Sequence, residues 1–177
     1  QRQMCIRDSN CIEAVCTACE QLSQTATGAL IVFERETKLG EQIDTGTIIN
    51  ATPSPELFGN IFFPNTPLHD GAVIIRDSKV YAAGCFLPKP QKEELISKAL
   101  GSRHRAAIGM SEVSDAVIVV VSEETGTISI AENGSLTRFY NKDTLRKLLT
   151  AKLIPEKPEA KKMKGKALKK HKKNAPD

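Results

Sequence analysis

Three continuous apolar runs constrain the fold of this chain more than any other feature of its sequence. They are Asp115 to Ser122 (DAVIVVVS), Gly28 to Glu34 (GALIVFE) and Ala72 to Ile75 (AVII). β-Branched and aliphatic residues in short runs favour strands. A strand without polar residues at alternate positions is covered on both faces, as in α/β proteins. The runs therefore predict a sheet with helices on both sides.

The remaining segments alternate between short helices and strands. We expect helices at residues 10–23, 55–62, 93–100, 103–113 and 143–152, and further strands at 79–86 and 127–131. Asp77-Ser78 and Asn133-Gly134 have the chemistry of hairpin turns, whereas residues 35–50 are expected to be mostly loop. Hairpins within this pattern predict a single α/β domain with a mixed central sheet flanked by helices.

The two ends of the chain differ in composition from its middle. Residues 1–9 (QRQMCIRDS) have no period and no helix start, so we interpret them as a foreign or unstructured lead-in to a domain at 10–154. Residues 155–177 contain nine lysines and three acidic residues, which predicts a disordered tail. The rest of the chain has 16 basic and 18 acidic residues, a net charge of −2 that argues against a nucleic-acid-binding domain.

Composition also narrows the class of protein. No apolar run reaches the roughly 18–20 residues that a membrane helix needs, and no secretory signal is evident. Five cysteines, an odd number, do not suggest a secreted disulfide framework, which indicates a reducing cytosol. Cys11, Cys16 and Cys19 have a spacing known from iron–sulfur proteins. Their place on an amphipathic helix, without a fourth cysteine nearby, instead favours simple packing.

Two short stretches carry groups suited to chemistry. His69, Asp70 and Gly71 stand directly before the Ala72 strand, where a glycine lets a ligand or a backbone approach closely. Taken alone, they could also be a tight turn with a hydrogen-bonded aspartate. Residues 101–107 (GSRHRAA) place two arginines around a histidine at a helix start. Guanidinium forks and free backbone N–H groups bind anions there, although a solvated charge cluster has the same sequence.

A carboxylate beside an anion site indicates nucleotide chemistry through a divalent metal. Mg²⁺ and Mn²⁺ prefer carboxylate and phosphate oxygens. Neither the P-loop motif nor the glycine-rich dinucleotide motif occurs in the sequence. Ser122 and Glu124 follow the Asp115 strand, and strand ends are where α/β proteins place their sites.

At this point the residues resemble a known family, the diadenylate cyclases, which make cyclic di-AMP from two ATP. Asp70-Gly71-Ala72 and Arg103-His104-Arg105 are similar to the family's two signature motifs, within the phrases FPNTPLHDGAVII and GSRHRAAIG. The similarity runs from about Gly28 to about Leu149 and is greatest to the membrane-anchored bacterial type. It implies the diadenylate cyclase fold and, for the full-length protein, a place at the cytoplasmic face of the cell membrane. There, N-terminal helices that this chain lacks would anchor it.

The resemblance also implies roles for single residues. Asp70 would bind Mg²⁺ or Mn²⁺ and help to activate a ribose 3′-hydroxyl, with His69 and Glu124 as further metal contacts. The catalytic residues would be Asp70, Arg103 and His104. The ATP-binding residues would be Gly71, Ala72, Phe86, Leu87, Ser102, Arg103, His104, Arg105, Ser122 and Glu124.

The reaction itself predicts a homodimer. Each ATP must offer its 3′-hydroxyl to the α-phosphorus of the other, so two sites must face each other across a two-fold axis. One alternative is a catalytically silent nucleotide sensor of the same fold, against which the intact Asp70 and Arg-His-Arg motif argue. The other is a nucleic-acid binder, suggested by the lysine-rich tail and opposed by the net charge of the rest.

Overall fold

A seven-stranded sheet forms the centre of the protein in a computed structural model that describes residues 2–155. The strand order is β2-β4-β3-β1-β5-β6-β7. The strands are β1 (Ala29–Phe33), β2 (Thr47–Ala51), β3 (Ala72–Arg76), β4 (Lys79–Cys85), β5 (Val117–Val121), β6 (Ile128–Glu132) and β7 (Ser135–Tyr140). β1 and β3 are parallel, and every other neighbouring pair is antiparallel. The predicted mixed sheet is confirmed.

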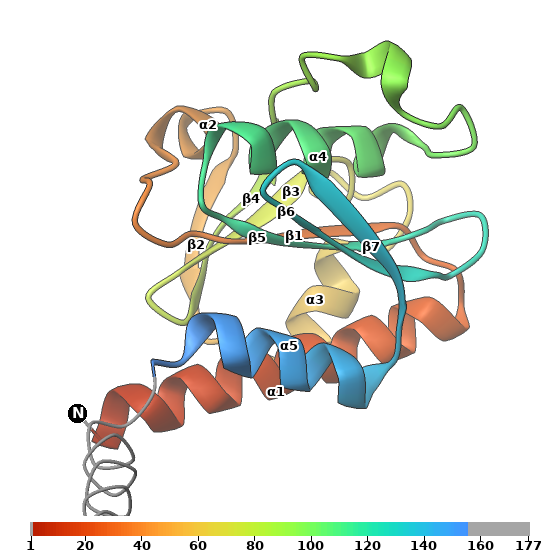
Figure 1. Cartoon of the computed structure of the whole chain (residues 1–177). Coiled ribbons are helices and arrows are strands. Elements are labelled where there is room, and N and C mark those ends of the chain that lie inside the picture. The colour runs from red at the N-terminus through yellow and green to blue at the C-terminus, as the bar shows by residue number, and fades with distance from the viewer. Residues whose placement is uncertain (1, 156–177) are drawn as a thin grey trace, which may run out of the picture.

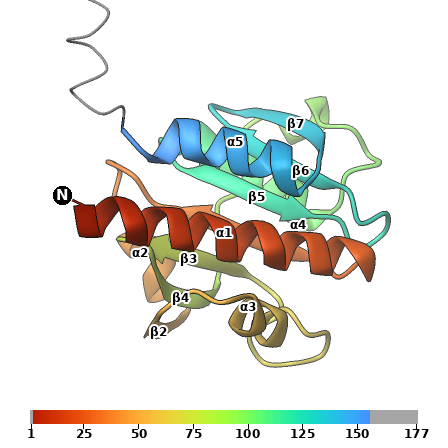
Figure 2. The same ribbon diagram turned by 90° about the horizontal axis from the view of Figure 1, so that it is seen from below.

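Helices cover both faces of this sheet, as the apolar runs predicted. One face carries α1 (Arg2–Gln24), α3 (Pro55–Ile61) and α5 (Lys142–Leu153), and the other carries α2 (Gly40–Asp44) and α4 (Ser102–Val113) (Figure 1). Seen from the face that carries α1, α3 and α5, helix α1 crosses the sheet between α5 and α3 (Figure 2). The sheet is therefore the middle layer of three.

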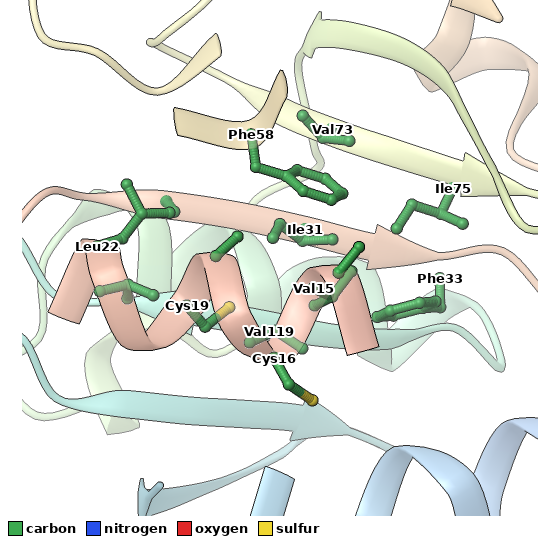
Figure 3. Close-up of a cluster of buried hydrophobic side chains, with 14 of the residues drawn as sticks. Val15, Cys16, Cys19, Leu22, Ile31, Phe33, Phe58, Val73, Ile75 and Val119 are labelled. Atoms are coloured by element: carbon green, nitrogen blue, oxygen red, sulfur yellow. The ribbon is translucent and has the colours of Figure 1, made fainter. Parts of the chain in front are cut away.

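The core has two halves because the side chains of β1 alternate between the two faces. Ile31 and Phe33 pack toward α1, whereas Leu30 and Val32 pack toward α4. All residues of β1 and β5 are buried, which explains why their sequences have no polar alternation. The α1 half also contains Phe58, from α3 (Figure 3).

Cys11, Cys16 and Cys19, on α1, are part of the α1 half of the core, and Figure 3 shows Cys16 and Cys19 there. Burial raises the pKa of the Cys11 and Cys16 thiols to about 12, and it also raises that of Cys19. A buried thiol that stays protonated behaves as a small apolar group. The buried positions of the three cysteines confirm the packing interpretation.

The N-terminal prediction was wrong in one respect. Helix α1 begins at Arg2 rather than at Asn10, so residues 2–9 are helical and not an unstructured lead-in. Asp8 accepts a hydrogen bond from the hydroxyl of Ser78, in the β3–β4 turn, which attaches this extension to the sheet. Their foreign origin stays a prediction. The expected disordered tail lies outside the described residues, apart from Pro155.

Three segments at the edges of the domain also differ from the predictions. Residues 35–50 contain α2 and part of β2 instead of a loop, and 93–100 contain only a 3₁₀ turn, Glu93–Leu95. β7 was not predicted. β2 and β7 are edge strands with mostly exposed residues, so they lack the apolar runs that reveal a central strand. No helix among the described residues is both long enough and apolar enough to cross a membrane.

Candidate active site

Strand directions bring most of the predicted site residues to one edge of the sheet. Ala29 pairs with Val121, and Ala72 pairs with Cys85. The starts of β1 and β3 therefore lie beside the ends of β5 and β4. Asp70, Phe86 and Ser122 are the residues just beyond three of these strand ends, so they lie along the same edge.

A pocket at this edge joins the start of α4, the β5–β6 turn and β7. Five of its lining residues were predicted from the sequence, namely Ser102, Arg103, His104, Ser122 and Glu124. Arg138, from β7, lines the same pocket and was not predicted. The only signal for it in the sequence was the Asn133-Gly134 turn, whose hairpin geometry implies a strand returning beside β6.

Arg103 lies across the backbone of Gly28, at the start of β1. A Cβ atom on Gly28 would be 2.6 Å from Nη1 and 2.7 Å from Cζ of Arg103, so a larger residue would displace the guanidinium. Nη1 donates to Glu123 Oε2 at 3.1 Å, whereas the buried Nε has no partner among the described residues. The guanidinium is thus held in the pocket with donor capacity left for an anion.

His104 is buried and uncharged at neutral pH. Its side chain is 5% exposed, and Nε2 has no hydrogen-bond partner among the described residues. Burial is the main cause that lowers its pKa, and the cations of Arg138 and Arg103 lower it further against the opposing Glu124. A neutral imidazole can donate or accept one hydrogen bond at Nε2, according to its tautomer.

The first turn of α4 supplies backbone donors to the same pocket. Gly101 is the N-cap and gives no side-chain cap, so N–H groups at the start of this helix are free and point along its axis. Facing them, Ser122 Oγ accepts the N–H groups of Glu124 and Thr125, both at 3.2 Å. Ser122 therefore shapes the turn that presents Glu124 and keeps its own proton to donate.

The Asp70 loop depends on a glycine. Gly71 has φ +137°, and a Cβ there would lie 2.8 Å from the backbone carbon of Gly84. Only glycine fits both the conformation and the space. Beside it, His69 donates from Nδ1 to the carbonyl of Thr66 at 2.6 Å, which leaves Nε2 as an acceptor. Asp70 itself is exposed.

The described residues contain no cluster of three histidine, cysteine or acidic side chains that could hold a metal ion. The expected metal contacts Asp70, His69 and Glu124 are therefore not gathered into such a cluster. The exposed carboxylate of Asp70 still suits Mg²⁺ or Mn²⁺, because these ions are commonly held by one or two carboxylates and completed by substrate phosphates. The residues fit a metal that arrives with its nucleotide.

Arg105, expected among the ATP-binding residues, is not part of the pocket lining. Its guanidinium donates to the carbonyls of Glu93 and Ser97 at 3.4 and 3.3 Å and pairs with the Glu93 carboxylate at 3.6 Å. These contacts brace the loop between β4 and α4. Arg105 therefore holds the loop that precedes the pocket residues of α4.

Phe86 and Leu87, which were also expected among the ATP-binding residues, lie outside the pocket lining as well. Phe86 is 66% exposed and its N–H donates to Thr45 Oγ1 at 2.9 Å. Leu87 packs against the α4 half of the core. Both follow β4, two strands away from β1 along the same edge.

Known proteins resemble this chain over most of its length. The family model described as "DisA bacterial checkpoint controller nucleotide-binding" matches residues 16–136. "Cyclic di-AMP synthase CdaA" of Bacillus subtilis is 49% identical over 140 residues, which are 79% of this chain and 51% of that protein. "Diadenylate cyclase" of Listeria monocytogenes is 44% identical over 81% of this chain and 52% of the relative. The chain thus spans about half the length of these curated relatives.

Solved structures agree with these relationships. The crystal structure of DacA from Staphylococcus aureus has a TM-score of 0.79 and 46% identity, covering 82% of this chain and 96% of that one. A "hypothetical membrane spanning protein from Bacillus cereus" has a TM-score of 0.68 and 47% identity, over 72% of this chain and 62% of that one. Together with the matching family model, they show that this chain belongs to the DisA-type nucleotide-binding family, the family of the diadenylate cyclases.

Proposed function

We propose that this chain is the catalytic part of a diadenylate cyclase, which condenses two ATP into cyclic di-AMP and two pyrophosphates. The observation that carries the proposal is the shared sheet edge. There, Arg103, His104 and the free N–H groups of α4 face the Ser122–Glu124 turn, and Asp70 follows on the neighbouring part of the edge. The names of the relatives support this reaction.

The phosphate groups would bind in the pocket. Arg103 offers its guanidinium fork, Ser102 a hydroxyl, and α4 its first N–H groups, so charge and helix dipole both favour an anion. Neutral His104 would donate a hydrogen bond from Nε2 without adding charge. Arg105 would contribute indirectly, by holding the loop before α4.

The nucleoside would lie farther along the edge, toward β3 and β4. Gly71 and Ala72 would lie against the nucleotide, and Phe86 and Leu87 would line the adenine side, in the order that the sheet gives these strands. The exposed ring of Phe86 is available for stacking.

Asp70 would act where the 3′-hydroxyl loses its proton. Mg²⁺ or Mn²⁺, held by Asp70 with His69 and Glu124 as proposed further contacts, would supply charge neutralisation at the phosphates and acidify the hydroxyl. Asp70 orients the hydroxyl and accepts its proton. Arg103 and the α4 N–H groups hold the α-phosphate in line.

Catalysis in this scheme requires a face-to-face homodimer. The 3′-hydroxyl of one bound ATP cannot attack the α-phosphorus of the same ATP in the productive geometry. A second site must therefore complete the reaction across a two-fold axis. We further propose that the full-length protein works at the cytoplasmic face of a bacterial membrane. The resemblance to a structure described as membrane-spanning supports this location.

The test is a cyclisation assay with the purified chain, ATP and either Mn²⁺ or Mg²⁺, in which cyclic di-AMP is measured by chromatography. Asp70→Asn should cut the rate roughly a hundredfold or more while ATP affinity, measured by calorimetry, stays within about twofold. Arg103→Ala should instead weaken ATP binding itself. ATP binding without any product from the unmodified chain would contradict the proposal and favour a silent sensor.

A further inference from the structure

A β-bulge near the end of β7 places one arginine in the pocket. β7 pairs with β6 through Thr137 opposite Ile130 and Tyr140 opposite Ile128, so the register shifts between these pairs. The shift accommodates one extra residue, at Arg138 and Phe139. Phe139 takes φ +70°, a left-handed conformation that is strained for a residue other than glycine.

The bulge lets β7 serve both faces of the sheet. Leu136 packs on the α4 half of the core and Tyr140 on the α1 half, although an unbroken strand would send both residues to the same face. Arg138 lies on the same face of the strand as Leu136, and it lines the pocket at the start of α4. Without the extra residue, Tyr140 and Arg138 could not both take these places.

Arg138 is a free cation in a site that already contains Arg103. It belongs to none of the ion pairs that the described residues form, and its guanidinium carbon lies over the ring of Phe139, 5.2 Å from the ring centroid. Glu123 and Glu124 also line this pocket, but Glu123 pairs with Arg103 and not with Arg138, so the Arg138 guanidinium keeps its donors for an anion. Strain and unpaired charge at the same place point to a ligand.

We propose that Arg138 binds the terminal phosphates of ATP and stabilises the pyrophosphate as it leaves. This inference rests on the proposed function. Along the sheet edge the expected adenine contacts follow β4, Asp70 precedes β3, the phosphate pocket lies at β1 and β5, and Arg138 comes from β7 at the far end. β7 is about 10 Å beyond β5, at roughly 4.8 Å for each strand. Arg138 therefore lies at the end of the pocket away from the ribose.

The chemistry gives a cation at this position a clear role. The bond from the 3′-oxygen to the α-phosphorus forms as the bond from that phosphorus to the bridging oxygen breaks. The electron pair stays on pyrophosphate, and the hydroxyl proton passes by way of Asp70 to water. Negative charge therefore grows on the leaving group, where Arg138 offers fixed positive charge. Arg138 also lowers the pKa of His104, as expected for a cation that acts within the pocket.

The test compares two nucleotides by calorimetric titration with Mg²⁺ present: α,β-methylene-ATP, which cannot release pyrophosphate, and AMP, which lacks the terminal phosphates. Arg138→Ala should weaken α,β-methylene-ATP binding about tenfold or more, the value of one charge-assisted hydrogen bond. It should leave AMP binding within about twofold. Arg138→Lys should recover part of the loss. Lys147→Ala, which removes an exposed cation from α5, is the matched control and should change neither affinity.

Phe139→Gly tests whether a change in the bulge itself, rather than the loss of the Arg138 charge, alters nucleotide binding. Glycine adopts the positive φ without strain, and the side chain that is lost is 79% exposed, so the bulge and the nucleotide selectivity should persist. Equal weakening of both nucleotides by Arg138→Ala, or no weakening, would overturn the inference. If the unmodified chain makes cyclic di-AMP, such a result contradicts Arg138 alone. If the unmodified chain makes no product, the proposed function fails, and the role of Arg138 fails with it.

Discussion

A single methyl group at Gly109 should separate the loop after β4 from helix α4. Gly109 lies in the middle of α4, directly beneath this loop. An added Cβ would come to 2.1 Å from the carbonyl oxygen of Pro88, 2.7 Å from the carbonyl carbon of Lys89 and 2.8 Å from the nitrogen of Pro90. All three are backbone atoms, and two belong to prolines, so no side-chain rotation relieves the overlap.

The size of the effect follows from two opposing contributions. Overpacking costs about 1–3 kcal/mol, and rigid neighbours place this site near the upper end. Alanine in a helix interior is about 1 kcal/mol more favourable than glycine. Gly109→Ala should therefore lower the free energy of unfolding by about 2 kcal/mol. At Gly59, in α3, an added Cβ meets nothing within 4 Å, so Gly59→Ala should raise it by up to about 1 kcal/mol.

Urea unfolding of the two variants beside the unmodified chain measures this difference, about 3 kcal/mol between them by the same reasoning. Because the displaced loop carries Leu87, Gly109→Ala should also weaken nucleotide binding, whereas Gly59→Ala should not. A Gly109→Ala protein as stable as the Gly59→Ala protein would refute the contact between the loop and α4.

Two further perturbations test the protonation of His104 and the role of the C-terminal tail. Acidification below about pH 6.5, the ordinary pKa of histidine, should destabilise the protein, because unfolded His104 takes up a proton that the buried side chain resists. In His104→Asn, the urea midpoint should change less with pH in this range than in the unmodified chain. The same change in both proteins would contradict the prediction. Deletion of residues 155–177 should leave the rate of cyclic di-AMP formation unchanged, since such a composition cannot bury a core; loss of product from a folded protein would contradict this.

The central strands of the fold could be predicted because their buried residues are consecutive in the sequence. β1 and β5 are buried along their whole length, and their sequences are apolar along their whole length. The two hairpin turns were predicted for a similar local reason. Asp77, Ser78, Asn133 and Gly134 all have positive φ, a conformation that glycine, asparagine and aspartate adopt more readily than other residues.

The edges of the domain could not be predicted in this way. β2 and β7 pair on one side only and expose most of their residues, so their sequences carry no uniform pattern. The segment 93–100 resembles a helix in composition, but most of it is exposed, and Arg105 holds its carbonyls from outside. Its conformation is set by tertiary contacts.

The residues of the candidate site show the same difference between segments with and without a clear sequence pattern. Arg103, His104, Ser122 and Glu124 could be predicted because each stands beside a strongly patterned element, and the topology then brought them together. Arg138 could not, because it depends on a bulge at which phenylalanine takes a conformation that its own propensity opposes.

Helix α4 explains why these separate segments can act as one site. Its first turn carries Arg103 into the pocket proposed for the phosphates. Arg105, two residues later, holds the loop before the helix, and Gly109 packs against the loop after β4. A helix of 12 residues is rigid on this scale. The positions of the phosphate contacts and of the expected adenine contacts are therefore fixed relative to one body. Such preorganisation is what in-line transfer between two bound nucleotides requires, because neither substrate has to wait for a loop to form its half of the site.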